Sequence, residues 1–349
     1  MKSNLDGNHK TRFGEFIILL FITLFLFIFS LAFGQTQIPL NEIFNSLFGE
    51  GDQGISSIII LESRLPFSVT ALLAGAALSV AGLILQTVFH NPLAGPSVLG
   101  VSAGSSLGVA IVMMSGISGA LFIDQTMGNW FLSMIGAIIG SLIIICLLLF
   151  FSSIVRNGVM LLILGIMVSY LSSSIVSLLS YVAPAESLKS FTIWGLGSYA
   201  GVTLSKIPLF SISIGVLCII SLGCIKPLNA LLLGERYASS MGYNIRSIRA
   251  LLLLLSGFLT AFITAYCGPI AFIGLIVPHI ARICFRTSDH SIILPACLLI
   301  GASVSLFCAI LSNGILNNIL LPINVVTPII GVPMIFYIIL RSKKLPYFR

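Results

Sequence analysis

The sequence predicts an all-α protein that crosses a membrane about ten times, as a single transmembrane domain over residues 1–349. Two observations lead to this fold class. Of the 349 residues, 58% are hydrophobic and only 8% are charged, whereas soluble domains carry about 25% charged residues. Apolar runs long enough to cross a bilayer as helices also recur along the whole chain. Such a chain lacks the polar residues to cover a water-facing surface.

Gly, Pro and charged residues divide the chain into ten apolar runs, which we predict to be the membrane helices. The first run exceeds the core of a signal peptide, about 7–15 residues, so we expect an uncleaved helix. Cys267-Gly268-Pro269 separates the seventh run from the eighth, because one helix through both would be too long for a single span. The third and eighth runs are short, and we expect them to span only in part. The runs are Phe16–Phe33, Pro66–Phe89, Val98–Met113, Trp130–Phe151, Val159–Tyr181, Ile207–Ile225, Ile248–Tyr266, Ile270–Cys284, Ile292–Leu311 and Val325–Leu340.

Two stretches between these runs are expected to form short helices outside the spans. One is Leu40–Phe48, and the other is the amphipathic, aromatic sequence FTIWGLGSYAG at residues 191–201. Trp194 and Tyr199 in the second stretch fit either of two roles, anchors at the membrane interface or contacts for a partner. Numerous small residues within the spans, such as Gly104, Gly108 and Gly140, predict close helix packing.

Lys and Arg residues indicate the orientation, because cytoplasmic loops of membrane proteins carry an excess of them. With the N-terminus in the cytoplasm, 14 basic residues fall in cytoplasmic segments and 3 in outer segments, namely Arg64, Lys189 and Lys206. We therefore expect both termini to be cytoplasmic. The cytoplasmic set is Lys2, Lys10, Arg12, Arg156, Lys226, Arg236, Arg246, Arg249, Arg282, Arg286, Arg341, Lys343, Lys344 and Arg349.

The segment 226–249, with the sequence KPLNALLLGERYASSMGYNIRSIR, is the internal stretch least suited to lipid. It carries five of the 27 charged residues, and the orientation places it in the cytoplasm. Leu228–Leu233 predicts a short apolar helix, Gly234-Glu235-Arg236 presents charge, and residues 241–244 predict a turn. An ordinary solvated loop does not need the apolar run, so we predict that this segment docks on another protein.

The sequence lacks the motifs that are typical of several other classes of protein. It has no phosphate-binding GxxxxGK[ST] motif, no HExxH or GxSxG motif and no paired carboxylates, so we expect no catalysis and no ATP binding by this chain. An ion-coupled secondary transporter of a small solute is the alternative, but it would place ionisable residues near the middle of the membrane. The seven cysteines form no CxxC pair and the four histidines are dispersed, so no metal site is predicted. The basic residues are scattered over short loops, which argues against a nucleic-acid partner.

Three regions of the chain resemble the FecCD-type permeases, the membrane subunits of ATP-binding-cassette (ABC) importers for iron–siderophores, haem and vitamin B12. The motifs are HNPLAGP within Arg64–Gly108, LLLGERYASSMGY and PHIAR within Leu231–Arg282 with DHSIILPACLLIGAS after it, and LPINVVTPIIGVP within Leu321–Arg341. They occur in order and at the spacing of the family, over nearly the whole chain from about residue 60.

The resemblance implies a homodimer of ten-helix subunits in the inner membrane of a bacterium. Two cytoplasmic ATPase subunits would hold ATP and Mg, and a periplasmic or lipid-anchored binding protein would deliver a metal chelate. The sequence leaves open whether the chelate is an iron–siderophore, haem or a cobalamin. The segment after the sixth span would form two coupling helices that contact the ATPase. Its motif residues are Leu231, Gly234, Glu235, Arg236, Ala238 and Gly242.

The resemblance also implies a cytoplasmic gate and an outer docking surface. The gate would comprise Asn91 and Leu93 after the second span, together with Gly158 and Val159 at the start of the fifth. Arg64 matches a family arginine that meets the binding protein. Two further arginine positions of the family are Phe67 and Asn313 here, so two of the arginines that would form salt bridges with the binding protein are absent. Lys189 and Lys206 are additional candidates by topology alone.

Overall fold

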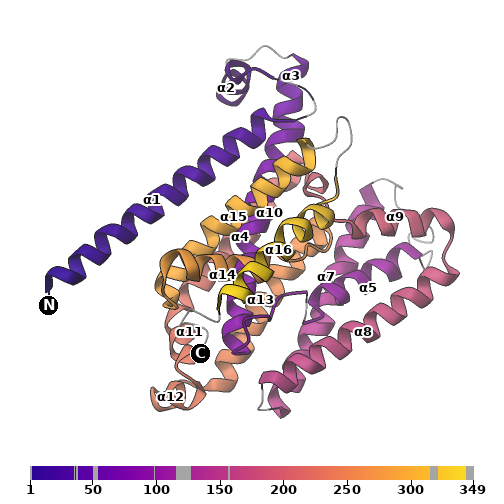
Figure 1. Cartoon of the computed structure of the whole chain (residues 1–349). Helices are drawn as coiled ribbons and strands as arrows, with labels where there is room; N and C mark the ends of the chain where they lie inside the picture. The colour runs from indigo at the N-terminus through magenta and orange to yellow at the C-terminus, as the bar shows by residue number, and fades with distance from the viewer. Residues whose placement is uncertain are drawn as a thin grey trace.

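The computed structural model describes residues 2–34, 36, 38–49, 54–97, 99–114, 127–155, 158–314 and 321–342. Over these ranges the chain forms helices and no strand, which confirms the predicted fold class. Four basic residues of the orientation count, Arg156, Lys343, Lys344 and Arg349, lie outside the described residues. Figure 1 shows the helices gathered into one bundle around α4 (Leu65–Val88).

Each of the ten predicted runs corresponds to a helix. Among the described helices, seven are long and apolar enough to cross a membrane. Three others, α5, α14 and α16, are apolar but shorter. The expectation of short third and eighth runs is therefore confirmed for α5 and α14, and α16 joins them. The ten helices are α1 (Lys2–Ala32), α4 (Leu65–Val88), α5 (Val101–Met114), α7 (Met127–Ile154), α8 (Gly158–Val182), α10 (Ile207–Gly223), α13 (Ile245–Cys267), α14 (Ile273–Phe285), α15 (His290–Gly314) and α16 (Ile323–Ser342).

Short helices connect the long ones. The expected helix at Leu40–Phe48 is present as α2, and part of the aromatic stretch lies in α9 (Ala185–Gly195). Helix α3 (Ile55–Ile58) and the π-helix η1 (Ile59–Arg64) lead directly into α4. The remaining short elements are η2 (Tyr199–Gly201), η3 (Leu204–Lys206), α11 (Ile225–Leu232) and α12 (Glu235–Ser240).

Helix α4 is the centre of the core, and most of its side chains are buried. Neighbouring helices approach it and one another at small residues. A Cβ atom on Gly75 of α4 would overlap the carbonyl oxygen of Gly301 on α15. The second close pair is α5 and α7, where a Cβ on Gly140 would overlap the carbonyl of Gly104. Backbone contact of this kind replaces the hydrophobic effect as the force between helices in lipid.

The predicted break between the seventh and eighth runs is confirmed. Helix α13 ends at Cys267, and Gly268 follows with a φ of 76°. Phe272 precedes α14 with a φ of 71°, which is strained for an aromatic residue. The side chain of Asn324 on α16 joins this break, since it donates to the carbonyl of Pro269 and accepts from the backbone N–H of Ala271.

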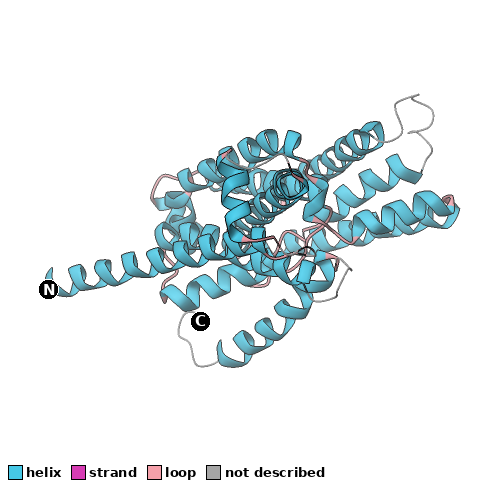
Figure 2. Ribbon diagram, turned by 90° about the horizontal axis from the view of Figure 1, so that it is seen from above, coloured by secondary structure: helices cyan, strands magenta, loops and turns pink. Residues whose placement is uncertain are grey.

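The short helices mark two opposite ends of the bundle. Helices α2 and α3 lie at the upper end in Figure 1, and α11 and α12 lie at the lower end. Helix α8 begins near the lower end and runs toward α9. Viewed from above, the N-terminal part of α1 extends sideways from the bundle (Figure 2). The lower end therefore collects α11, α12, the end of α4 and the start of α8.

Candidate coupling segment and gate

The segment 226–249 forms two short helices followed by the first turn of α13, as the sequence predicts. Gly234 separates α11 from α12 with a φ of 106°, and Gly242 has a φ of 88°. Both conformations favour glycine because a Cβ atom would be strained there. Asn244 then caps α13 by accepting the backbone N–H of Ser247 at 3.3 Å. These features turn the chain sharply out of the bundle and back.

One side of the two helices holds them to the bundle. Leu228, Leu231 and Ala238 are buried against the core. The buried guanidinium of Arg249 donates to the carboxylate of Glu235, which ties α12 to the start of α13. Glu235 therefore serves an internal contact, and of the two charged residues in the Gly234-Glu235-Arg236 sequence Arg236 is the exposed one.

The other side is apolar and exposed, although the sequence places it in water. Four large side chains and Arg236 form what we call the docking patch. The apolar members are 40–64% exposed. Apolar groups gathered on a water-facing segment are typical of a surface that a partner covers. They are Leu232, Leu233, Tyr237 and Met241.

The gate residues lie on two elements near this end. Asn91 and Leu93 belong to the loop 89–97 after α4, which we call the gate loop, and the side chain of Asn91 accepts the backbone N–H of Leu93 at 2.9 Å. Leu93 is 52% exposed, and Val159 on the first turn of α8, directly after Gly158, is 55% exposed. Beyond the gate loop, Gly100 faces Ser169 on α8. Leu93 and Val159 are thus accessible, and the closure of the two gate pairs on one another stays a prediction.

Polar side chains that sequence reasoning missed surround the end of α4. Gln86 donates to the carbonyl of Leu275 at 3.1 Å and accepts from Arg282 at 2.6 Å. His279 lies 2.8 Å from the carbonyl of Pro92 in the gate loop, so its Nε2 is the donor. The histidine and arginine of the PHIAR motif were the available signal. The contacts of His279 and Arg282 depend on α14 lying beside the end of α4, which the sequence does not show.

The three outer candidates differ in their surroundings. Arg64 is only 8% exposed, and its guanidinium donates to the carbonyls of Leu31 and Ala32 at 2.8 and 2.9 Å. It thereby caps the C-terminal end of α1, whose last carbonyls have no partner within the helix. Lys189 on α9 is exposed, and Lys206 at the end of η3 is half-buried.

The two positions that depart from the family pattern are also placed. Phe67 is buried and meets Tyr199 edge-on, with ring centroids 5.8 Å apart. Tyr199 is itself fully buried, so it packs in the core, and the interface role considered for it is not supported. Trp194 is half-buried and stacks on Phe191. Asn313 lies near the end of α15, half-buried.

Helix α8 presents hydroxyl groups on an exposed face. Tyr170, Ser174, Ser177 and Tyr181 recur at helical spacing, and all four are exposed. Polar groups of a membrane helix normally face the interior of a bundle or a water-filled cavity. An exposed stripe of this kind favours a second subunit or a pathway beside α8.

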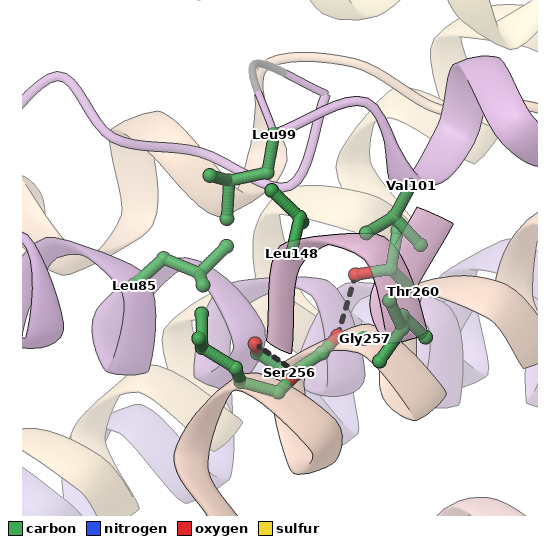
Figure 3. Close-up of a pocket in the computed structure, with 9 residues that line it drawn as sticks. Leu85, Leu99, Val101, Leu148, Ser256, Gly257 and Thr260 are labelled. Atoms are coloured by element: carbon green, nitrogen blue, oxygen red, sulfur yellow. Dashed lines mark hydrogen bonds between the residues drawn. The ribbon is translucent and has the colours of Figure 1, made fainter. Parts of the chain in front are cut away.

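Two cavities are lined mainly by apolar groups, one of about 160 Å³ beside Pro96 and Phe272 and a much smaller one beside α13. Figure 3 shows Leu85, Leu99 and Leu148 converging above Ser256 and Thr260 of α13. The space between them is about 10 Å³, room for roughly one water molecule. The two hydroxyls donate to carbonyls of their own helix and leave no polar group free for a ligand. Among the described residues, no cluster of His, Cys, Asp or Glu could hold a metal ion.

Comparison with known proteins agrees with this arrangement. The model of the FecCD transport family matches residues 22–341. A vitamin B12 import system permease protein, BtuC, of Klebsiella pneumoniae is 34% identical over 326 residues, covering 93% of this chain and 92% of the relative. A protein of Methanocaldococcus jannaschii assigned as an ABC transporter permease is 31% identical over 350 residues, covering 98% of both. A solved inward-facing structure, assigned to the metal-chelate type of ABC transporter, has a TM-score of 0.78 and 28% identity, covering 96% of this chain and 99% of that one.

Proposed function

Because this chain belongs to the FecCD transport family, we propose that it is the permease subunit that carries a metal chelate from the periplasm to the cytoplasm in an ABC importer. The observation that carries the proposal is the docking patch on α11 and α12. An exposed apolar surface with one arginine, at the end of a membrane bundle, is suited to a water-soluble partner. The chain contains no phosphate-binding loop, so energy must come from that partner.

The partner at the docking patch is a cytoplasmic ATPase subunit that holds ATP and Mg. Leu231 and Ala238 seat the two helices on the bundle, and Gly234 and Gly242 supply the turns. Arg236 and its apolar neighbours make the contact. ATP binding would displace the helices and switch the gate at Asn91, Leu93, Gly158 and Val159. No reaction takes place on this chain.

A second copy of the chain completes the pathway. The exposed hydroxyls on α8 would be costly against lipid, and a homodimer in which α8 faces the axis gives them a polar surrounding. A chelate passing between two such stripes meets small hydroxyl groups and apolar side chains. Such a surface binds a bulky substrate weakly, which suits release. Two ATPase subunits follow from two docking patches.

The upper end receives a substrate-binding protein. Lys189 is exposed on α9, and Lys206 is half-buried at the end of η3, so both are suited to acidic groups of that protein. Arg64 contributes indirectly in this conformation, since it holds the end of α1. In this proposal the upper end faces the periplasm, the lower end faces the cytoplasm, and the protein lies in a bacterial inner membrane.

The substrate class rests on the relatives and not on a pocket. Known relatives are vitamin B12 permeases and a transporter of the metal-chelate type, and both classes of cargo are large metal complexes. The alternative, a secondary transporter driven by an ion gradient, is not favoured. Charged side chains described within the bundle, such as Arg64, Arg249 and Arg282, lie toward its ends and are hydrogen-bonded.

Reconstitution tests this proposal. The chain is purified with the ATPase that accompanies it and inserted into lipid vesicles, with the binding protein on the outside. Radiolabelled iron–siderophore, haem and cyanocobalamin are offered in turn. We expect uptake of one class that requires ATP and stops with vanadate. Uptake driven by a proton or sodium gradient, without any ATPase subunit, would contradict the importer and favour the alternative.

A further inference from the structure

The gate loop is bonded directly to the coupling segment. The imidazole Nε2 of His90 lies 2.9 Å from the carbonyl oxygen of Leu231. Because a carbonyl only accepts, Nε2 carries the proton. Leu231 is in the last turn of α11, and its carbonyl also accepts the backbone N–H of Gly234 at 2.9 Å, so His90 adds a side-chain cap to this end of α11. His90 adopts a φ of 48°, a conformation that costs about 1–2 kcal/mol for a non-glycine residue. The backbone is thus held in strain where it aims the ring at α11.

A second bridge begins one turn earlier on α4. The hydroxyl of Thr87 lies 2.8 Å from Nε2 of His290, and Nδ1 of His290 lies 2.8 Å from the side-chain oxygen of Asn229 on α11. His290 and Thr87 are both buried. This chain of three side chains crosses from the end of α4 through the start of α15 to the middle of α11.

The orientation of each group in the second bridge is fixed by its neighbours. The backbone N–H of His290 must donate, and it donates to the side-chain oxygen of Asn229 at 2.8 Å. The amide nitrogen of Asn229 then faces the carboxylate of Asp289, at 2.7 Å. Asp289 in turn accepts the backbone N–H of Ser291 at 2.9 Å, as an N-cap does. Nδ1 of His290 is therefore a donor, and in the neutral ring Nε2 accepts the single proton of Thr87 in place of the carbonyl of Leu83, which lies 2.9 Å from the same hydroxyl.

The opposite side of the gate loop is bonded to α14 and not to the coupling segment. His279 donates to the carbonyl of Pro92, and Gln86 is held by Leu275 and Arg282. The end of α4 thus has one set of contacts to the bundle and another to α11. A displacement of α11 pulls on His90 and Thr87, while the α14 contacts resist it.

We propose that His90 and the Thr87–His290–Asn229 bridge are positioning residues that make the gate loop follow α11 when the ATPase moves the docking patch. This inference rests on the proposed ATPase partnership. The gate loop and the end of α4 then have two kinds of contact with different roles. Bonds to α11 transmit the movement, and bonds to α14 set the resting position.

Distance measurements on the complex test the inference. Nitroxide labels are placed at Leu93 in the gate loop and at Ile139, an exposed position on α7, in a background without other reactive cysteines. The permease–ATPase complex in nanodiscs is measured before and after addition of ATP, Mg and vanadate. In the parent chain we expect the distance to change. The double variant His90→Phe with Thr87→Val should lose at least about half of that change, while ATP hydrolysis continues. Transport per ATP should fall about tenfold, within the usual range of coupling energies.

Matched variants separate transmission from general damage. Thr192→Val removes a hydroxyl that lies 2.8 Å from a carbonyl of its own helix, as the hydroxyl of Thr87 lies 2.9 Å from that of Leu83. Because Thr192 takes part in no bridge to α11, this variant should leave the distance change intact. His90→Gln keeps a donor and should restore most of the change. His279→Phe breaks the α14 contact and should alter the resting distance while the ATP-driven change persists. A full distance change in the His90→Phe, Thr87→Val variant would overturn the inference. A parent chain that recruits no ATPase would overturn the proposed function and the inference with it.

Discussion

Single residues in the coupling segment divide into those that face the bundle and those that face outward. The sequence presents Glu235 and Arg236 as one charged pair, and only the folded chain separates them. Glu235 bonds Arg249, fourteen positions along the chain, whereas Arg236 is exposed among apolar neighbours. Residues adjacent in sequence therefore have different roles, because successive side chains of a helix point in different directions.

Charge reversal of Arg236 is expected to weaken the ATPase contact selectively. Arg236→Glu should lower the affinity for the ATPase by at least about fivefold. The new carboxylate would either repel acidic groups of the partner or be left without a partner in the interface, and both are unfavourable. Glu235→Gln should instead lower the stability of the permease by about 1–2 kcal/mol, because the buried Arg249 loses its charged partner. The loss stays small because Glu235 itself is half-exposed to solvent. Pull-down and thermal unfolding in detergent measure the two effects. Arg246→Glu, an exposed position on α13 outside the docking patch, is the control. An equal loss of ATPase from Arg236→Glu and Arg246→Glu would contradict the role given to Arg236.

Arg64 illustrates the same point at the other end of the bundle. Its guanidinium is turned to the end of α1, so Arg64→Leu should destabilise the protein by about 1–3 kcal/mol, through the buried carbonyls of Leu31 and Ala32. Lys189→Glu should leave stability unchanged and reduce the affinity for the binding protein severalfold. Unfolding temperature and binding to the immobilised partner distinguish the two. A selective loss of binding in Arg64→Leu, with stability unchanged, would return Arg64 to the docking surface.

Among the elements, the close helix pairs depend on glycines that face carbonyl groups. On α5 and α7, Gly104 faces Gly140 and Gly108 faces Gly136, so two small-xxx-small patterns oppose each other. The sequence alone shows that both helices carry the pattern. It does not show that they pair with one another, because α4, α14 and α15 also carry glycines at close contacts.

A methyl group at one of these glycines should therefore be costly. Gly140→Ala places a Cβ against the backbone carbonyl of Gly104 and should destabilise the protein by about 1–3 kcal/mol, the usual cost of overpacking. Gly215→Ala on α10 is the matched control, because nothing lies within 4 Å of its added Cβ. It should be neutral or stabilising by up to about 1 kcal/mol, from helix propensity. Unfolding in mild detergent measures both variants. Equal effects of the two substitutions would argue against the α5–α7 pairing.

At the scale of the whole molecule, local sequence properties were enough to predict the helices but not their partners. Hydrophobic length, proline and glycine predicted all ten apolar helices, seven long and three shorter, and the break after Cys267. The direction of the Arg64 side chain, the pair Glu235–Arg249 and the contacts of His90 join residues far apart in sequence. Such contacts depend on which helices are neighbours, and a pattern of hydropathy does not contain that information. His90, His279 and His290 lie in the sequence motifs, but no residue next to them in sequence indicated a contact, so their roles could not be predicted.

The distribution of Lys and Arg predicts the orientation of the whole chain in the membrane, with both termini in the cytoplasm. Helices α11 and α12 of the segment 226–249 lie at the lower end of the bundle in Figure 1, and α9, which carries Lys189, lies away from that end. Single cysteines at Ser240 on α12 and at Lys189 on α9, both exposed, test this in a chain from which the seven native cysteines are removed. In intact cells with a permeabilised outer membrane, a membrane-impermeant maleimide should label Lys189→Cys. Ser240→Cys should react only after the inner membrane is opened. The reverse pattern would invert the topology, and because an ATPase must meet the docking patch in the cytoplasm, it would remove the importer function together with the orientation.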